Sequence, residues 1–211
     1  FAKIDDDAKL TAFLVEADSP GISTNPEEKK MGIRGSDTHS LMFSDVKVPK
    51  ENRIGEDGFG FNFAMAVLNG GRIGIAAQAL GIAQAAFEAS VVYAKERQQF
   101  NKSISRFQTI QNYLADMATH IDAARLLLHR AAASKDKGVP FSAQASMAKL
   151  FCSDTARTVT DMAVQIHGGY GYLSDYGVER IVRDLRVHQI LEGTNEIMRV
   201  MISRALSQRA G

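Results

Sequence analysis

The sequence predicts a mainly α-helical protein: an up-and-down helical bundle preceded by part of an antiparallel β-domain. Three of the four prolines lie before residue 55, among short strand-like runs. From residue 58 onward, apolar side chains recur every three or four residues, which is the period of a helix. Long helices with short connections pack as antiparallel neighbours. We therefore expect residues 1–55 to be the C-terminal part of an incomplete β-domain and residues 56–211 to be a helical domain.

Two apolar runs before Pro49 predict strands. Residues 10–15 end at a turn signal, and residues 41–48 end in alternation of apolar and polar side chains. Residues 22–24 add a possible third strand. We expect two to four antiparallel strands, which are too few for independent stability without a packing partner.

The first helical segment begins near residue 58 and ends near Arg97. Its apolar repeat includes Ile73, Ala77 and Leu80. Residues 70 and 71 are both glycine. We expect the helix to be locally less stable there, because glycine costs about 1 kcal/mol in a helix interior.

Four further helices are expected. Glycine signals stop the second at Gly138 and the third at the loop 168–171. A short helix and a terminal helix follow. The predicted ranges are 107–136, 141–167, 176–184 and 194–208.

The composition is that of a globular chain with a real core. Hydrophobic residues make up 45% and charged residues 23%, which excludes disorder as the dominant state. The net charge is +1, and Lys and Arg form no stripe, so a nucleic-acid partner is not expected. The single cysteine, Cys152, excludes an intramolecular disulfide framework and fits a reducing compartment. His120, His129 and His188 show no ligand spacing, so no metal is expected.

No targeting or membrane segment is expected. The N-terminus shows no signal-peptide pattern, and a chain that begins with Phe1 looks processed or cut from something longer. The longest apolar stretch, residues 73–87, contains Gln78 and Gln84 and is too short to cross a bilayer. We therefore expect no membrane insertion.

Three segments are candidates for chemistry, and each also has a purely structural interpretation. The glycine cluster at residues 167–172 is either a helix C-cap with a turn or a backbone cradle for a cofactor. It is not GxGxxG and follows no strand, which excludes a Rossmann site. Arg97, with Gln108 opening the next helix, is either a solvated helix end or a phosphate clamp.

The third candidate is the segment EGTNE at residues 192–196. It is either the N-cap segment of the last helix or the site of a catalytic carboxylate. Gly193 leaves one face of Glu192 uncovered, and the apolar pair before it would desolvate the carboxyl group. Burial beside an apolar pocket raises a carboxyl pKa toward the range that suits a general base.

Six motifs together resemble the C-terminal half of an acyl-CoA dehydrogenase, nearest to the short-chain and isobutyryl branch. The resemblance covers essentially the whole chain, with the motifs in the family's order. They are MGIRGSDT (31–38), FSDVKVP (43–49), NGGR (69–72), YAKERQQF (93–100), QIHGGYG (165–171) and EGT (192–194).

The resemblance implies FAD-dependent α,β-dehydrogenation of an acyl-CoA thioester to the trans-2-enoyl-CoA. The glutamate matching Glu192 accepts the α-proton, and hydride passes to flavin N5. Some branches instead carry the base at the position of Gly71, and glycine cannot serve as a base, which favours Glu192.

The resemblance also assigns binding residues. Arg97 and Gln108 match contacts to the FAD diphosphate of the neighbouring subunit. The other residues that match FAD contacts are Gln165, Ile166, His167, Gly168, Gly169, Thr194, Asn195 and Glu196. Those matching acyl-CoA contacts are Asn69, Gly70, Gly71, Arg72 and Gly193.

Partners and location follow from the same resemblance. It implies a homo-oligomer, either a dimer or a dimer of dimers, that passes electrons to an electron-transferring flavoprotein in fatty acid or branched-chain amino acid catabolism. The location is the bacterial cytoplasm or the mitochondrial matrix. The family's N-terminal helical domain and the first half of its β-domain have no counterpart in these residues, so we expect the 211 residues alone to be inactive.

Two other functions stay open. An acyl-CoA oxidase of the same fold would reoxidise its flavin with dioxygen. A non-catalytic helical scaffold would keep the fold for oligomerisation alone.

Overall fold

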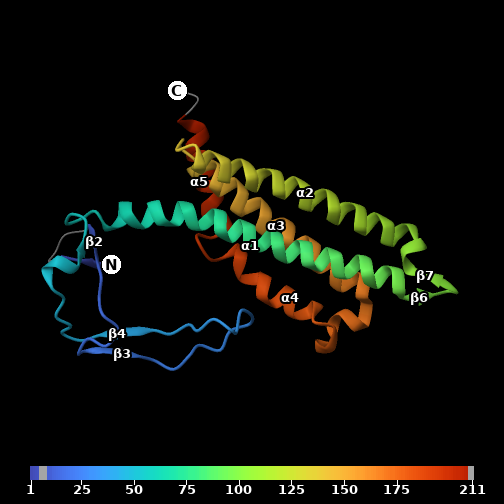
Figure 1. Cartoon of the computed structure of the whole chain (residues 1–211), viewed down its shortest axis with the longest axis horizontal. Coiled ribbons are helices and arrows are strands. Elements are labelled where there is room, and N and C mark those ends of the chain that lie inside the picture. The colour runs from blue at the N-terminus through green and yellow to red at the C-terminus, as the bar shows by residue number, and fades with distance from the viewer. Residues whose placement is uncertain (5–8, 209–211) are drawn as a thin grey trace. The chain divides into compact units, whose positions relative to one another are not determined.

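The computed structural model describes residues 1–4 and 9–208 (Figure 1). It divides into two compact units, Phe1–Leu68 and Asn69–Gly211. The division falls inside the first long helix, α1 (Gly60–Glu96), whereas the sequence predicts a domain boundary between residues 55 and 56. The mainly α-helical class with a few antiparallel strands is confirmed.

The first unit contains two small antiparallel sheets. One has the strand order β1 (Ala2–Lys3), β2 (Leu10–Phe13), β5 (Arg53–Ile54). The other pairs β3 (Ile22–Thr24) with β4 (Leu41–Phe43).

These sheets bury little surface. Among the described residues of the unit, Thr11, Ala12 and Gly60 are buried. Thr11 is fixed by a hydrogen bond from the Gly58 amide to its Oγ1, at 2.9 Å. All three residues of β4 are exposed. The unit has paired strands but almost no core, as expected for so few strands.

The second unit is a helical bundle formed by the rest of α1 and four further helices. They are α2 (Gln108–Asp136), α3 (Ser142–His167), α4 (Val178–Leu185) and α5 (Asn195–Ser207). A short hairpin of β6 (Gln98–Gln99) and β7 (Lys102–Ser103) connects α1 to α2.

Local signals set the helix ends where the sequence predicts them. Gly138 and Gly168 have φ values of +66° and +58°, which favour glycine and follow the ends of α2 and α3. Thr194 caps α5, because its Oγ1 accepts a hydrogen bond from the Ile197 amide at 3.4 Å.

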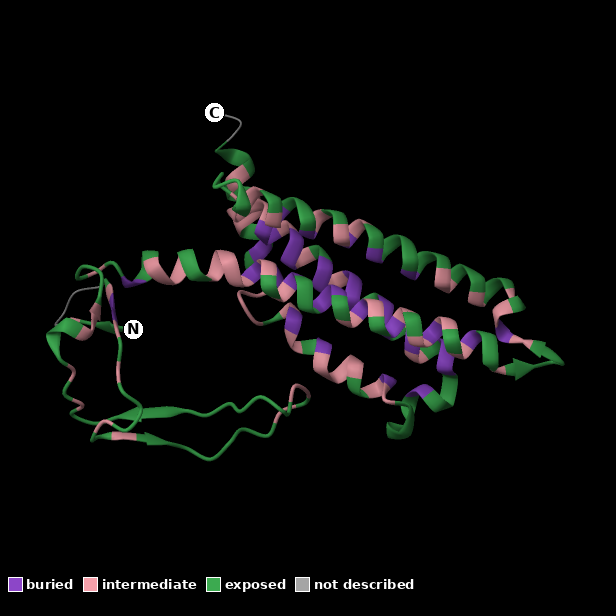
Figure 2. Ribbon diagram, viewed as in Figure 1, coloured by how far each residue is buried: buried purple, intermediate pink, exposed green. Residues whose placement is uncertain are grey.

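The core of the bundle lies between α1, α2 and α3, with α4 packed beside them. Figure 2 shows buried residues along the facing sides of these helices. Many are alanines, which allow helix backbones to approach closely, and larger side chains fill the remaining space. The fully buried alanines are Ala76, Ala79, Ala83, Ala86, Ala94, Ala124, Ala131, Ala145, Ala148, Ala156 and Ala163.

Truncating a large side chain in this core should be costly. Met117 on α2 is 0% exposed and belongs to the central cluster. We expect Met117→Ala to lower the free energy of unfolding by about 2–5 kcal/mol, because it loses apolar contacts and leaves a cavity. Leu126→Ala, at a side chain that is 65% exposed on the same helix, should change it by less than about 1 kcal/mol. Urea denaturation of both variants checks this, and equal losses would contradict it.

Helix α1 is longer than the apolar stretch in the sequence indicates. It has 37 residues and is long and apolar enough to cross a membrane by length and composition. The expectation that this region is too short to span a bilayer is therefore wrong, because the helix continues on both sides of residues 73–87. A buried helix in a protein core has the same composition, and α1 contributes five fully buried alanines to the core.

Candidate active site

Glu192 lies in a tight turn before α5, in a conformation unusual for a residue with a side chain. Its φ is +54°, and that of Gly193 is +92°. The Glu192 Oε2 atom is buried and accepts no hydrogen bond from any residue in 1–4 or 9–208. A buried carboxylate oxygen without a hydrogen-bond donor is costly, and such an unsatisfied group in a folded protein points to a functional role.

The carboxylate of Glu192 lies against Gly71 of α1. A Cβ atom added at Gly71 would come within 2.6 Å of Oε2 and 3.1 Å of Cδ. The helix continues through residues 70–71 without a break, so the expected weak point does not interrupt it. Glycine at position 71 thus provides the space that the carboxylate occupies.

Arg72 follows Gly71 and is 2% exposed. Its Nε donates to the Glu192 carbonyl oxygen at 3.4 Å, and its Nη1 donates to Asn69 Oδ1 at 2.8 Å. Burial lowers the pKa of Arg72, and the negative charge of Glu192 opposes that shift. The Ser142 hydroxyl donates to the same Asn69 oxygen at 3.0 Å, so α1 and α3 together fix the arginine.

Lys149 of α3 supplies a second buried cation at this turn. It is 0% exposed, and its Nζ donates to the Gly193 carbonyl oxygen and to Asn195 Oδ1, both at 2.8 Å. Burial lowers the pKa of Lys149 to about 8, while Asp154 acts in the opposite direction. The ammonium group is therefore still mainly protonated at neutral pH.

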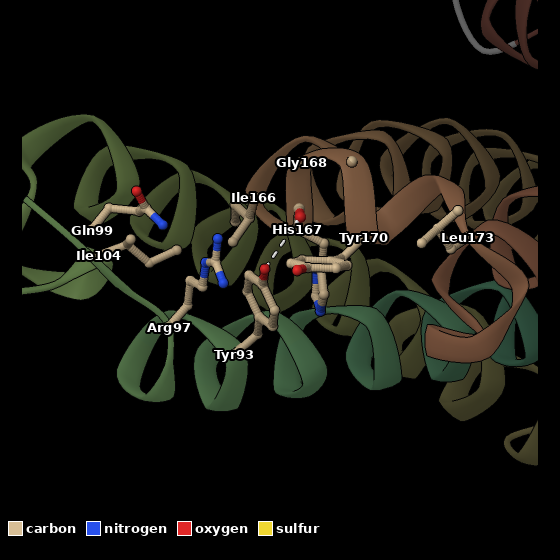
Figure 3. Close-up of a pocket in the computed structure, with 10 residues that line it drawn as sticks. Tyr93, Arg97, Gln99, Ile104, Ile166, His167, Gly168, Tyr170 and Leu173 are labelled. Carbon is tan, nitrogen blue, oxygen red and sulfur yellow. Dashed lines mark hydrogen bonds between the residues drawn. The ribbon is translucent and has the colours of Figure 1, made fainter.

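A second group of residues lines a cavity of about 480 Å³ at the junction of α1 and α3 (Figure 3). Arg97 points toward the cavity from the end of α1, near Tyr93. A Cβ atom at Gly168 or Gly169 would meet nothing within 4 Å, so the glycine backbone faces open space. The lining residues are Tyr93, Arg97, Gln99, Ile104, Ile166, His167, Gly168, Gly169, Tyr170 and Leu173.

Aromatic contacts fix the walls of this cavity. The rings of Tyr93 and His167 stack with centroids 4.2 Å apart, and the Tyr93 hydroxyl donates to the His167 carbonyl oxygen at 3.3 Å. The Arg97 guanidinium lies 5.2 Å from the centre of the Tyr170 ring. Within the described part of the chain it forms no ion pair, so its charge is available to an anion.

The structure divides the predicted cofactor residues into groups. It brings Arg97 together with residues 166–169 at the cavity. Gln165 and Gln108 are exposed, and neither lines it. Thr194, Asn195 and Glu196 line a separate polar recess beside Asp154. The side chain of Asn195 is buried in hydrogen bonds to α3.

The predicted acyl-CoA residues cluster with Glu192. Gly71 and Arg72 lie at the turn, and Asn69 is joined to it through Arg72. A Cβ atom at Gly193 would meet Met198 Cε at 2.8 Å and Arg72 Nη2 at 3.9 Å. A Cβ atom at Gly70 would instead meet Lys135 Nζ at 3.5 Å.

The sequence interpretation does not include Lys149, Tyr93 or Tyr170. A signal for Lys149 is present, because it lies four residues after Ala145 and three before Cys152, on the buried stripe of α3. A charged residue on an apolar stripe indicates a buried polar contact. Tyr93 and Tyr170 lie within the quoted motifs, but nothing local distinguishes them as cavity walls.

Comparison with known proteins identifies relatives at high identity. The chain is 52% identical over 197 residues to an acyl-CoA dehydrogenase of Bacillus subtilis, covering 93% of this chain and 52% of that protein. It is 50% identical over 200 residues to the acryloyl-CoA reductase (NADH) of Anaerotignum propionicum, covering 95% and 51%. The chain thus spans about half the length of the curated relatives it matches.

Solved structures show the same fold. The butyryl-CoA dehydrogenase of Megasphaera elsdenii superposes with a TM-score of 0.91 at 52% identity, covering 93% of this chain and 51% of that one. An acyl-CoA dehydrogenase of Bacillus anthracis in complex with FAD superposes with a TM-score of 0.94 at 39% identity, covering 99% and 39%. The family model described as the acyl-CoA dehydrogenase C-terminal domain matches residues 58–207. The chain therefore belongs to the acyl-CoA dehydrogenase family and carries that family's C-terminal helical domain.

Proposed function

We propose that this protein oxidises a short-chain acyl-CoA thioester between its α and β carbons, with Glu192 as the base. The observation that carries the proposal is the unpartnered, buried Oε2 of Glu192, held against Gly71 in a left-handed turn. The name of the butyryl-CoA dehydrogenase relative favours a short acyl chain.

Glu192 would take the α-proton onto its carboxylate. The α-proton of a thioester is weakly acidic, so the base must be positioned and shielded from water. The turn is held in position because Arg72 donates to the Glu192 carbonyl oxygen and Lys149 donates to the Gly193 carbonyl oxygen. Burial of Oε2 shields the carboxylate from water.

The cavity beside Arg97 fits part of a dinucleotide. The guanidinium of Arg97 suits a diphosphate, and the open glycine backbone at residues 168–169 admits close approach of a ligand. Tyr93 and Tyr170 provide aromatic surface. When bound, FAD supplies the acceptor for the β-hydrogen, which leaves as hydride. Arg97, Ile166, His167, Gly168 and Gly169 would hold it.

Removing the Arg97 charge should weaken FAD binding. We expect Arg97→Ala to raise the Kd for FAD by about 10-fold to 100-fold, since a charge-assisted hydrogen bond contributes about 1.5–3 kcal/mol. The free energy of unfolding of the FAD-free protein should change by less than about 1 kcal/mol, as is typical for a charge at a helix end. FAD content after gel filtration measures the loss.

Arg106→Ala is the matched control for Arg97→Ala. Arg106 is exposed nearby, in the 3-10 helix Ile104–Arg106, and does not line the cavity. Its replacement should leave FAD content unchanged. Equal FAD retention by both variants would show that the Arg97 charge interacts only with the end of α1 and does not bind FAD.

A panel of acyl-CoA thioesters tests the proposed activity. Under anaerobic conditions, butyryl-CoA should bleach the oxidised flavin absorbance of the full-length protein, and branched or longer acyl-CoAs should do so more slowly. No bleaching by any member of the panel would favour a non-catalytic scaffold. Rapid reoxidation of the reduced flavin by dioxygen would favour an oxidase.

The reverse reaction is a second candidate function. The 50% identical relative named acryloyl-CoA reductase (NADH) supports it. In this direction Glu192 would return a proton to the α-carbon of an enoyl-CoA. Oxidation of NADH upon addition of acryloyl-CoA, measured with any electron-transferring partner present, distinguishes reductase from dehydrogenase.

The remaining partners are proposals that rest on the family resemblance. We place the protein in a homo-oligomer, a dimer of dimers, which delivers electrons to an electron-transferring flavoprotein. The bacterial cytoplasm or the mitochondrial matrix is the proposed location.

A further inference from the structure

Lys149 is the largest fully buried side chain in the described part of the protein. Burying an ammonium group is costly, so its hydrogen bonds must compensate. Both acceptors belong to the segment that follows Glu192: the Gly193 carbonyl oxygen and Asn195 Oδ1, each at 2.8 Å. Helix α3 thereby holds this segment on both sides of Thr194.

The turn that Lys149 contacts is conformationally unfavourable. Glu192 and Gly193 are consecutive residues with φ of +54° and +92°. A residue with a Cβ atom rarely adopts this conformation unless its surroundings impose it. A cation bound to the Gly193 carbonyl oxygen fixes the peptide plane that follows these two residues. Lys149 is therefore well placed to maintain the turn.

The second acceptor, Asn195, is itself fixed. Lysine only donates and an ionised carboxylate only accepts, so the amide of Asn195 has one orientation between them. Its Oδ1 faces Lys149, while its Nδ2 donates to Asp154 Oδ1 at 2.8 Å and to Ser153 Oγ at 2.9 Å. The first residue of α5 is thus tied to α3 through a network with fixed polarity.

Other charges near the ammonium come from each helix that surrounds it. They are Asp154 on α3, Arg72 on α1, Glu196 on α5, and Glu192 in the turn. The three carboxylates favour the protonated lysine, and Arg72 opposes it. Burial has the largest effect and lowers the pKa of Lys149 to about 8, and the carboxylates limit that decrease.

We infer that Lys149 is a positioning residue for Glu192. By holding the Gly193 carbonyl oxygen and the Asn195 amide, it maintains the left-handed turn that lays the Glu192 carboxylate against Gly71. The conformational part of this inference stands on the structure alone, whereas the effect on reaction rate rests on the proposed function.

Lys149→Met tests the inference, since methionine fills much of the same volume but donates no hydrogen bond. Hydrogen–deuterium exchange in the full-length protein should become about tenfold faster in peptides that cover residues 190–196. Flavin reduction by butyryl-CoA should slow by about 10-fold to 100-fold, because a displacement of about 1 Å at a reacting group can cost about 100-fold in rate. The Kd for acetyl-CoA, which has no β-carbon to oxidise, should stay within about threefold of the wild-type value.

Ser146→Ala is the matched control on the same helix. Ser146 is buried, and its hydroxyl donates to the Ser142 carbonyl oxygen rather than to the turn. This variant should leave both exchange at residues 190–196 and flavin reduction unchanged. It separates loss of a buried hydrogen bond in α3 from loss of the contact to the turn.

Lys149→Gln serves if the methionine variant does not fold. Its amide keeps a donor on a side chain one bond shorter, so exchange and flavin reduction should be intermediate. Exchange at residues 190–196 equal to wild type in the folded variants would overturn the inference. If the wild-type flavin is not reduced by butyryl-CoA, the proposed function fails, and the exchange measurement still decides the role of Lys149.

Discussion

Glu192→Gln should slow flavin reduction by butyryl-CoA about 10³-fold or more, with FAD content and acetyl-CoA affinity close to wild type. Glutamine has nearly the same shape, so the turn and its contacts to Arg72 and Lys149 remain possible. It cannot accept the α-proton, and loss of a positioned general base costs about 10²–10⁴ in rate. Stopped-flow absorbance of the oxidised flavin measures the effect.

Asp122→Asn is the control for the charge change. It makes the same carboxylate-to-amide exchange at an exposed residue of α2 and should leave the rate unchanged. A Glu192→Gln rate within tenfold of wild type would exclude Glu192 as the base.

Gly71→Ala should be the next most damaging substitution to the reaction. The new Cβ would lie 2.6 Å from Glu192 Oε2, so the carboxylate or the helix must move. A displacement of about 1 Å at a reacting group can cost about 10²-fold in rate. We expect a loss of that size in flavin reduction, together with a decrease of about 1–3 kcal/mol in the free energy of unfolding from overpacking.

Gly74→Ala makes the same change one turn further along α1. A Cβ there meets nothing within 4 Å, so alanine should stabilise the protein by about 0.5–1 kcal/mol through its higher helix propensity. Flavin reduction should be unaffected. If Gly71→Ala behaves like Gly74→Ala in both rate and thermal unfolding, then the close contact between residue 71 and Glu192 is not significant.

The ends of the helices could be predicted from the sequence because local residues determine them. The third helix is predicted at 141–167 and observed at Ser142–His167, where Gly168 ends it with a positive φ. The second and last helices likewise agree to within one residue at each end. Capping and glycine signals depend on a few neighbouring residues, so no knowledge of the tertiary structure is needed.

The buried face of α1 could not be predicted as well. Ala77 belongs to the apolar repeat in the sequence but is exposed, whereas Ala76 and Ala79 are 0% exposed. Alanine and glycine occur on every side of this helix, so hydrophobicity alone does not distinguish its faces. The packing of α2 and α3 determines which alanines are buried.

The candidate site likewise has some features that local sequence predicts and others that depend on tertiary contacts. Gly71 and Glu192 could be named from motifs, and the structure brings them together. The partners of Lys149 lie 44 and 46 residues later in the chain, and no local pattern predicts such contacts. Spacing likewise gives no indication that Asn195 points into the protein interior instead of toward a ligand.

The length of α1 bears on how many chains a working site needs. From Gly71 to Glu96 there are 25 steps along one continuous helix, which at 1.5 Å each is about 38 Å. Glu192 lies against Gly71 at one end of this span, and the cavity beside Arg97 lies just past Glu96 at the other end. The Glu192 turn and the Arg97 cavity are therefore separated by most of the length of α1. The family resemblance, in which Arg97 and Gln108 match contacts to the FAD diphosphate of the neighbouring subunit, accounts for this separation. In the proposed homo-oligomer, loss of Arg97 from one subunit would then lower turnover at the Glu192 of its neighbour.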